Sequence, residues 1–422
     1  MKKIFLFCTV CLVLMTGVSC SKASQDPEPF PKTVDYKVVA EKTIPRNEFL
    51  DSLSSSFESK EAAKSFAATV PQNMTFESLT VNYTSVDQNG KDVTLSGIVI
   101  IPKIGGKFTA GKIALNNRAT QLSNSDVPSH NWNCGTIIAA RNYVLVSSDL
   151  IGFGASVDRP VNFCCNHLAG RNSLDLVIAA QQILHEEQRG LGLGGRILPF
   201  INTGYSQGGY SALAVHRYWE CNATETETQM APLERSFCGA GPYSLNEMMD
   251  FHFGNGTSLY TPYLVLGLMS AMDYHPELFT GYKIEDFLAP EATEMKLVDK
   301  IREKKTGNQA LIVYVLLKTG IAHSLDHIFK KEVMTKGTEL NNVVSNGIAA
   351  ENVLTGWIPA KRPIKFYHAY EDDCVPSTCT MAAEKAFKSS TQVDFIWDSS
   401  KKALLLHATV EKYFNEWLLS IL

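Results

Sequence analysis

A serine between glycines lies near the middle of the chain, where its hydroxyl could act as a nucleophile. Residues 204–209 read Gly-Tyr-Ser-Gln-Gly-Gly; they follow the apolar run 197–201 and precede residues 210–215, which have a helical pattern. Small residues beside Ser206 permit the sharp strand-to-helix turn of a nucleophile elbow. The helix behind the turn directs backbone N–H groups to the place where an acyl oxyanion forms. The simpler interpretation is a glycine-rich turn with a solvated serine.

A serine hydroxyl is a weak nucleophile unless a neighbouring group takes its proton. A neutral imidazole does so when a carboxylate fixes its tautomer and direction. Asp372 and His407 follow Ser206 in the chain, and each of the three comes after a predicted strand. We therefore expect the three side chains to meet along one edge of a sheet. The order nucleophile, acid, histidine is the order expected of an α/β-hydrolase.

Neighbouring residues compete for two of these roles. Of the ten histidines, His407 is favoured because it lies in the loop between the last predicted strand and the last helix. His368 lies within a strand, where a packed side chain is expected. Glu371 and Asp373 flank Asp372, and the residue types alone leave all three acids open. A solvated loop charge is the alternative interpretation of Asp373.

The oxyanion of an acyl intermediate needs two N–H donors. The backbone of Gln207, directly after the serine, is one expected donor. The second should come from the loop after the predicted strand 113–115, where residues 116–120 read Asn-Asn-Arg-Ala-Thr. This loop lacks the His-Gly start common in such enzymes. We predict Thr120 as the second donor, with Ala119 as the alternative.

The elements that must position these residues begin with an antiparallel segment. Residues 41–68 carry apolar side chains at helical spacing, which predicts a helix. Residues 76–83 and 93–102 read as strands, and the Asn-Gly pair at 89–90 predicts a hairpin turn between them.

From residue 112 onward, short apolar runs alternate with loops and helices, a pattern typical of a parallel sheet that is buried on both faces. The expected strands are 113–115, 143–146, 198–203, 237–241, 363–368 and 393–397. The expected helices are 172–185, capped by Asn172, then 381–388 and an amphipathic C-terminal helix. The predicted fold class is α/β, with a mostly parallel central sheet flanked by helices.

Residues from about 243 to 354 interrupt this alternation with helical signals that are rich in aromatic residues and methionine. Such an insertion fits a helical cap over the carboxyl ends of the strands, placed before the strand that bears the acid. Most of its apolar residues are expected to form the cap's own core. The predicted organisation is core 37–242, cap 243–356 and core 357–422.

The composition and net charge of the chain indicate which kind of molecule it binds. The 422 residues are 45% hydrophobic and 19% charged, with a net charge of −4, which is ordinary for a globular protein. No basic stripe of the kind that binds nucleic acid is evident, so the expected partner is a small molecule. For a serine esterase or lipase this partner is an ester or lipid substrate. Serine chemistry needs no metal or organic cofactor, and none is predicted.

The N-terminus has the layout of a secretory signal peptide, with two lysines, an apolar run and small residues before Cys20. Residues 1–19 are the predicted signal peptide. A cysteine at that place resembles a bacterial lipoprotein signal, in which Cys20 carries lipid, and residues 20–36 then form a proline-rich tether. The prediction is a bacterial cell-envelope lipoprotein in the outer membrane, in contact with the membrane through this anchor. A periplasmic or secreted protein is the alternative.

Export would favour disulfides among the remaining cysteines. Cys374 could pair with Cys379 across a short loop, and Cys221 with Cys238 around residues 222–234. The adjacent pair 164–165, followed by Asn and His, could suggest a metal site. No second ligand set accompanies that pair, so no metal site is predicted.

From about Ser148 to its end, the chain resembles the secretory lipases of the lipase-A type, which are capped α/β-hydrolases. The shared pieces are the elbow at 204–209, Gly-Ala-Gly-Pro at 239–242, residues 366–376, and the His-Ala-Thr segment at 407–409. In the family the acid lies four residues before a proline, which implies Asp372 here. The family has an acid in the oxyanion loop where this chain has Thr120. The resemblance implies hydrolysis of acyl esters on apolar substrates beneath a helical lid.

Together these features predict an exported serine esterase or lipase that forms an acyl-enzyme on Ser206. Two alternatives are carried with it. A serine peptidase of the same fold would be favoured by a negatively charged residue in the cap pocket, placed to meet a peptide amine. A catalytically silent binding protein with a hydrolase fold is the other, and the complete set of triad residues argues against it.

Overall fold

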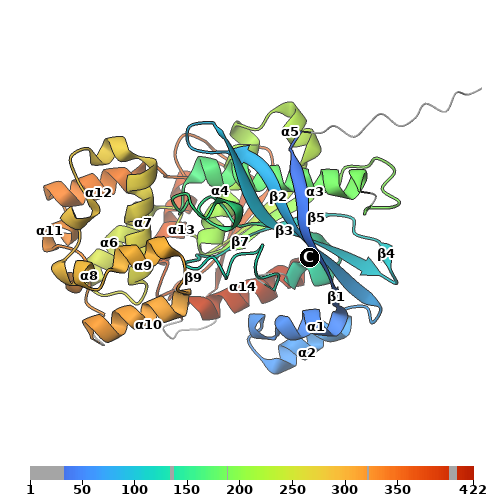
Figure 1. The fold of residues 1–422 in the computed structure, drawn as a ribbon, viewed down its shortest axis with the longest axis horizontal. Helices are drawn as coiled ribbons and strands as arrows, with labels where there is room; N and C mark the ends of the chain where they lie inside the picture. Colours follow the sequence, from blue (N-terminus) through green and yellow to red (C-terminus); the bar gives the residue numbers. More distant parts are fainter. Residues whose placement is uncertain (1–32, 134–136, 188, 321–322, 399–405) are drawn as a thin grey trace, which may run out of the picture.

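The computed structural model describes residues 33–133, 137–187, 189–320, 323–398 and 406–422 (Figure 1). The signal peptide, Cys20, most of the predicted tether and Cys134 lie outside the described residues. Among the helices that are described, none is both long and apolar enough to cross a membrane.

A ten-stranded sheet runs through the molecule in the order β1-β2-β3-β6-β5-β7-β8-β9-β10, with β4 paired to β3. The strands are β1 (Tyr36–Pro45), β2 (Met74–Val86), β3 (Asp92–Ile104), β4 (Lys107–Phe108), β5 (Ile113–Asn117), β6 (Val144–Ser148), β7 (Phe200–Tyr205), β8 (Leu233–Gly239), β9 (Ile364–Ala369) and β10 (Val393–Asp398). The first strands pair antiparallel up to the β3–β6 pair, and every later pair is parallel. The predicted antiparallel start and mostly parallel remainder are confirmed.

The predicted helix at 41–68 is wrong in its first part. Residues up to Pro45 form the edge strand β1, which pairs with β2, and helices α1 (Arg46–Ser52) and α2 (Lys60–Thr69) follow. Only Ile44 of β1 is buried, so the strand lacks the apolar alternation that identifies a strand in sequence. Proline at position 45 has an extended conformation and is the N-cap of α1, which is where the strand gives way to helix.

The helix predicted at 172–185 is longer, since α3 covers Asn166–Glu186 and its N-cap residue is Cys165. Asn172 is therefore not a cap. It lies buried inside the helix, where its side-chain amide donates to Ser85 Oγ at 2.7 Å and to Val86 O at 3.0 Å. This asparagine ties α3 to the end of β2. Its polar side chain suggested a cap because the sequence alone does not reveal that distant partner.

Both faces of the central strands are buried, as the continuous apolar strands predicted. Val144 and Val146 of β6 face one core, which includes α3, whereas Leu145 between them faces the second. That second core includes apolar residues of α1, of α2 and of the C-terminal helix α14 (His407–Ile421). The helices α4 (Gln207–Cys221), α5 (Glu225–Met230) and α13 (Ser377–Ala386) complete the elements around the sheet.

A set of helices stands between β8 and β9 in the chain, and we call residues 245–349 the helical insertion. It comprises α6 (Leu245–Asn255), α7 (Thr261–Tyr274), α8 (Pro290–Glu294), α9 (Leu297–Glu303), α10 (Asn308–Thr319), α11 (Lys331–Met334) and α12 (Glu339–Ala349). Figure 1 shows these helices gathered at one end of the molecule. Their apolar side chains build a core of their own, separate from the two cores of the sheet.

Candidate active site

Ser206 is the single residue that connects strand β7 to helix α4. Its backbone has φ 61° and ψ −128°, a conformation that few residues other than glycine adopt. A hydrogen bond from Ser206 N to Gly239 O at 2.9 Å holds the turn against the neighbouring strand β8. A strained serine between a strand and a helix has the backbone geometry of a nucleophile elbow.

Gly208 and Gly209, which follow the serine, lie so close to the backbone of neighbouring segments that no side chain fits there. A Cβ at Gly208 would lie 2.1 Å from Asn117 O, and one at Gly209 would lie 2.2 Å from Gly239 O. The start of α4 thus packs directly on the loop after β5 and on the end of β8. No side chain fits in either contact, so the glycines bring the neighbouring loops to the elbow.

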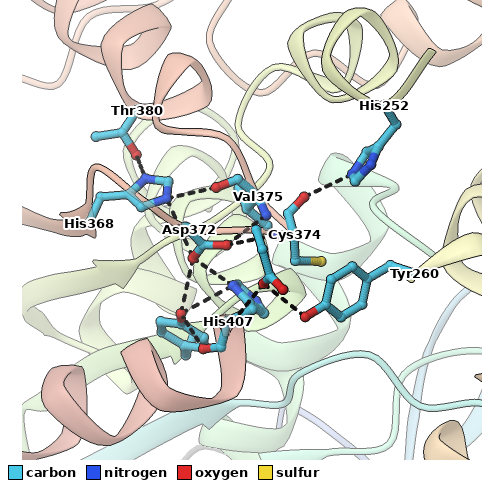
Figure 2. Close-up of polar contacts among 10 residues, drawn as sticks. His252, Tyr260, His368, Asp372, Cys374, Val375, Thr380 and His407 are labelled. Carbon is cyan, nitrogen blue, oxygen red and sulfur yellow. Dashed lines mark hydrogen bonds and ion pairs between the residues drawn. The ribbon is translucent and has the colours of Figure 1, made fainter. Parts of the chain in front are cut away.

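Asp372 and His407, the predicted acid and base, form a hydrogen-bonded pair (Figure 2). His407 Nδ1 donates to Asp372 Oδ2 at 2.7 Å, and Asp372 Oδ1 accepts the backbone N–H groups of Cys374 and Val375, both at 2.9 Å. Burial disfavours the ionised form of Asp372, but the charge and hydrogen bond of His407 oppose it and leave the pKa of Asp372 below its ordinary value. The pair lies where β9 and β10 end.

The second ring nitrogen of His407 has a different environment. His407 Nε2 is buried, and none of the described residues is a hydrogen-bond partner for it. With Nδ1 donating to Asp372, the neutral ring presents Nε2 as an acceptor, which is the state that a general base needs. No hydrogen bond joins Ser206 to His407 within the described part of the chain; apo sites commonly have this contact open.

Tyr205 links the serine to the other two residues. It precedes Ser206 in the chain, and its hydroxyl donates to His407 O at 2.9 Å. The same oxygen lies 3.2 Å from His407 Nδ1 and 3.4 Å from Asp372 Oδ2, while the two rings are 4.7 Å apart. The hydroxyl of Tyr205 thus contacts both Asp372 and His407, and the backbone joins Tyr205 to Ser206. Sequence reasoning missed Tyr205, although its position beside the serine was an available signal.

Asp373 supports the histidine from outside the pair. Its Oδ1 atom accepts the backbone N–H of His407 at 2.8 Å and the hydroxyl of Tyr260 at 2.9 Å. His407 is the first residue of α14 rather than a loop residue, so Asp373 satisfies one of the N–H groups that a helix start leaves without a partner. The interpretation of Asp373 as a solvated charge is wrong. Glu371 is exposed.

Two buried histidines hold the turn that carries Asp372. His368 Nε2 donates to Val375 O at 3.0 Å and its Nδ1 accepts from Thr380 Oγ1 at 2.6 Å, while His252 Nε2 donates to Cys374 O at 2.9 Å (Figure 2). Burial lowers the pKa of both histidines to about 4, so both rings are neutral near pH 7. His368 is packed within β9, as expected, and His252 comes from the helical insertion.

The predicted oxyanion donors Gln207 and Thr120 belong to the two segments that meet where Gly208 contacts Asn117. Gln207 is the first residue of α4, and the N–H groups of a first turn have no acceptor within the helix. Thr120 is buried in the loop after β5, and no described residue accepts a hydrogen bond from its backbone N–H. Asn117, the last residue of β5, contacts Gly208. The loop that follows β5 and includes Thr120 therefore begins beside the elbow.

The predicted disulfides are wrong. Cys221, Cys238, Cys374 and Cys379 are free thiols, as are Cys164 and Cys165. Cys238 is buried in a central strand and Cys221 is exposed at the end of α4, so a link would have to cross the core. Burial raises the pKa of the thiols of Cys238, Cys374 and Cys379, which keeps them protonated and unreactive. No cluster of three or more metal-binding side chains occurs among the described residues.

An apolar cavity of about 90 Å³ lies between the helical insertion and residues 163–165. It is lined mainly by aromatic and aliphatic side chains, with Met248 and Met249 of α6 and Tyr263 and Leu264 of α7 among them. Phe163 in its wall follows Asn162, whose carbonyl accepts the side-chain amide of Gln207 at 3.5 Å. The cavity thus adjoins the segment that contacts the elbow.

Comparison with known proteins gives matches at the level of structure. No protein-family model and no curated protein sequence matches the chain. A candidate hydrolase from Legionella pneumophila has a TM-score of 0.70 at 18% identity, over 92% of this chain and 96% of that one. Ligand-bound LipA, a rice cell wall degrading esterase from Xanthomonas oryzae, has a TM-score of 0.68 at 17% identity, over 92% and 96%.

Lipase A from Candida antarctica in its closed state is also similar, with a TM-score of 0.57 at 16% identity, over 88% of this chain and 77% of that one. Together with the sheet order and the elbow, these likenesses show that the chain has the α/β-hydrolase fold. Its relatives in structure include an esterase and a lipase.

Proposed function

We propose that this protein is a serine hydrolase of the lipase-A type that cleaves carboxylic esters. The observation that carries the proposal is the buried Asp372–His407 pair, which keeps Nδ1 of His407 occupied and leaves Nε2 as an acceptor with no partner among the described residues. The ring of His407 lies 4.7 Å from the ring of Tyr205, the residue that precedes Ser206. An esterase and a lipase among the similar structures support the same reaction class.

In the proposed reaction, His407 Nε2 takes the proton of Ser206 Oγ as that oxygen bonds to the ester carbonyl carbon. The backbone N–H groups of Gln207 and Thr120 stabilise the oxyanion. The tetrahedral intermediate then breaks the ester C–O bond, and the alcohol leaves with the proton from His407. Water repeats the sequence on the acyl-enzyme and releases the acid and free Ser206. Asp372 stabilises the imidazolium at both stages.

The apolar cavity is the proposed site for the acyl chain, with the helical insertion acting as a cap. A carboxylate in this cavity could instead have met a peptide amine, and Glu351 does line it. However, Glu351 Oε1 accepts from His275 Nε2 at 2.7 Å and Oε2 accepts the backbone N–H of Asn166 at 2.7 Å. Both oxygens are engaged within the protein, so the cavity favours an apolar acyl group over a charged amine.

Hydrolysis of p-nitrophenyl esters of graded chain length tests the reaction. We expect turnover by the wild type and a loss of at least about a thousandfold in kcat for Ser206→Ala. Ser211→Ala is the matched control, because Ser211 is a buried serine of α4, the helix that follows Ser206, and its hydroxyl has no partner among the described residues. Full hydrolysis by Ser206→Ala would end the proposal, as would an inactive wild type.

A pair of glycine variants tests the cavity. Gly267 in α7 lines it, and a Cβ there would meet only Phe163, at 3.6 Å, so Gly267→Leu should fill part of the space without displacing backbone. We expect the preferred acyl chain to become shorter in this variant. Gly254→Leu is the control, since a Cβ at this exposed position of α6 meets nothing within 4 Å. An unchanged preference in Gly267→Leu would place the acyl chain elsewhere.

We also propose that the protein is exported and carries lipid on Cys20 after removal of residues 1–19. The motif in the sequence supports this proposal. Radiolabelled palmitate fed to expressing bacteria should label the wild type and not Cys20→Ser. Label in the serine variant would contradict the proposed anchor.

A further inference from the structure

The side chain of Asn308 reaches from the helical insertion to the loop that carries Thr120. Its Nδ2 group donates to Thr120 O at 2.6 Å, and its Oδ1 atom accepts the backbone N–H of Leu122 at 2.9 Å. Asn308 is the first residue of α10 and is 188 positions from Thr120 in the chain. One amide therefore binds the backbone on both sides of residue 121.

A second contact joins the same two segments. Asn124 N donates to Lys304 O at 2.8 Å, four residues before Asn308. Lys304 is buried, and its ammonium group donates to Val157 O and Arg159 O, both at 2.6 Å. Lys304 thus joins this segment by hydrogen bonds to residues 157–159, a loop outside the helical insertion. Through Lys304 O and the Asn308 side chain, residues 304–308 hold the 120–124 loop by hydrogen bonds.

The opposite end of that loop contacts the elbow. Its origin at Asn117 lies against Gly208, where a Cβ would come within 2.1 Å of the Asn117 carbonyl oxygen. The loop therefore runs from the elbow to Asn308. Its contact with the elbow fixes where it starts, and Asn308 fixes the peptide groups on either side of residue 121.

We propose that Asn308 is a positioning residue for the oxyanion hole, so that the helical insertion completes the catalytic site as well as covering it. This inference rests on the proposed function. The carbonyl and the N–H of Thr120 lie on two peptide groups that share the Cα of Thr120. A hydrogen bond to the carbonyl fixes the position of that Cα, so only the rotation about φ and ψ of Thr120 is left to move the N–H. An oxyanion donor is effective only within about 2.7–3.1 Å of the developing charge, and a displacement of about 1 Å can cost about a hundredfold in rate.

Asn308→Asp tests the positioning role most directly. An aspartate keeps the acceptor for Leu122 N–H but loses the donor to Thr120 O, and places a negative charge beside that carbonyl. We expect kcat for p-nitrophenyl esters to fall by about 10- to 100-fold with KM changed by less than about threefold, since the donor acts in the transition state. Asn308→Ala removes both bonds and should lose at least as much. Asn342→Asp, at an exposed position of α12, is the control.

Two further readouts separate positioning from general damage. Binding of a trifluoromethyl ketone, which mimics the tetrahedral state on Ser206, should weaken in parallel with kcat/KM. Amide hydrogen exchange at Leu122 should accelerate in Asn308→Ala, and that measurement does not depend on turnover. Unchanged kcat in an active Asn308→Asp enzyme, or unchanged exchange at Leu122, would overturn the inference while the proposed reaction stands. An inactive wild type would instead overturn the reaction, and the exchange measurement would still decide the role of Asn308 in holding the loop.

Discussion

Asp373 binds the backbone of His407, at 2.8 Å, and leaves the imidazole to Asp372. Two adjacent carboxylates thus serve one histidine in different ways. Asp372 is completely buried and contacts the ring, whereas Asp373 is partly exposed and contacts the start of α14. The two aspartates should therefore respond differently to the same substitution.

Asp372→Asn should reduce kcat by about a thousandfold or more, because an amide in this place favours the wrong tautomer of His407. Asp373→Asn keeps an oxygen that can accept the His407 N–H and should cost no more than about tenfold. Steady-state kinetics on one p-nitrophenyl ester decide the matter. Equal losses in the two variants would contradict the assignment of Asp372 as the acid of the site.

Tyr205→Phe should weaken the site without dismantling it. The variant keeps the ring under His407 and removes the hydroxyl that donates to His407 O. We expect unfolding to become easier by about 1–2 kcal/mol, which is the usual effect of losing one buried hydrogen bond, together with a fall in kcat. Urea unfolding and ester hydrolysis measure the two effects. A variant with wild-type kcat would show that Tyr205 does not orient the histidine.

Tyr260→Phe tests the link between the helical insertion and His407. The hydroxyl of Tyr260 donates to the same oxygen of Asp373 that accepts the His407 N–H. Its removal should lower kcat by about three- to tenfold, an effect of about 1 kcal/mol. In Asp373→Asn the further loss from Tyr260→Phe should be smaller, because the two groups act together. Additive losses in the double variant would indicate independent roles.

Acid should destabilise the protein in a defined pH range through His252 and His368. Burial lowers the pKa of each from 6.5 to about 4. Below about pH 6.5 these two histidines bind protons in the unfolded chain but not in the folded protein. The free energy of unfolding therefore falls as the pH drops from about 6.5 to about 4. Each histidine accounts for up to about 3 kcal/mol over that range. Asp372, whose pKa is lowered, weakens the fold only below its ordinary pKa of 3.8.

Urea unfolding at about pH 7 and about pH 5 checks this expectation. His368→Asn should be less stable than the wild type at pH 7, because it loses the bonds to Val375 and Thr380. Its stability should nevertheless depend less steeply on pH, since the contribution of the His368 ring is gone. A variant with the wild-type slope would exclude His368 as a source of the pH dependence.

Much of the fold and part of the candidate site can be predicted from local patterns in the sequence. The apolar alternation of β2 and β3, the short buried strands of the parallel sheet and the elbow around Ser206 are each encoded within about a dozen residues. The contact of Asp372 with His407 follows from the ends of neighbouring strands β9 and β10. Such features are readable because covalent spacing and sheet geometry alone place them.

The remaining site residues depend on contacts between distant segments. Asn308 binds a loop 188 positions away, and Tyr260 binds Asp373 113 positions away. Nothing near either residue in the sequence distinguishes it from an ordinary polar side chain at the start of a helix. The edge strand β1 was mistaken for helix for a related reason, since its pairing with β2 and not its own pattern makes it a strand.

The parallel pairing of β8 with β9 joins Ser236 to Ile364 across the whole helical insertion. Closing so long a loop costs little more free energy than closing a shorter one, because the entropy grows only with the logarithm of length. The strand β7 that leads to Ser206 pairs with β5 and β8, which come before the insertion, whereas Asp372 and His407 follow the last two strands. A chain that stops short of β9 would carry a reactive-looking serine with nothing to activate it.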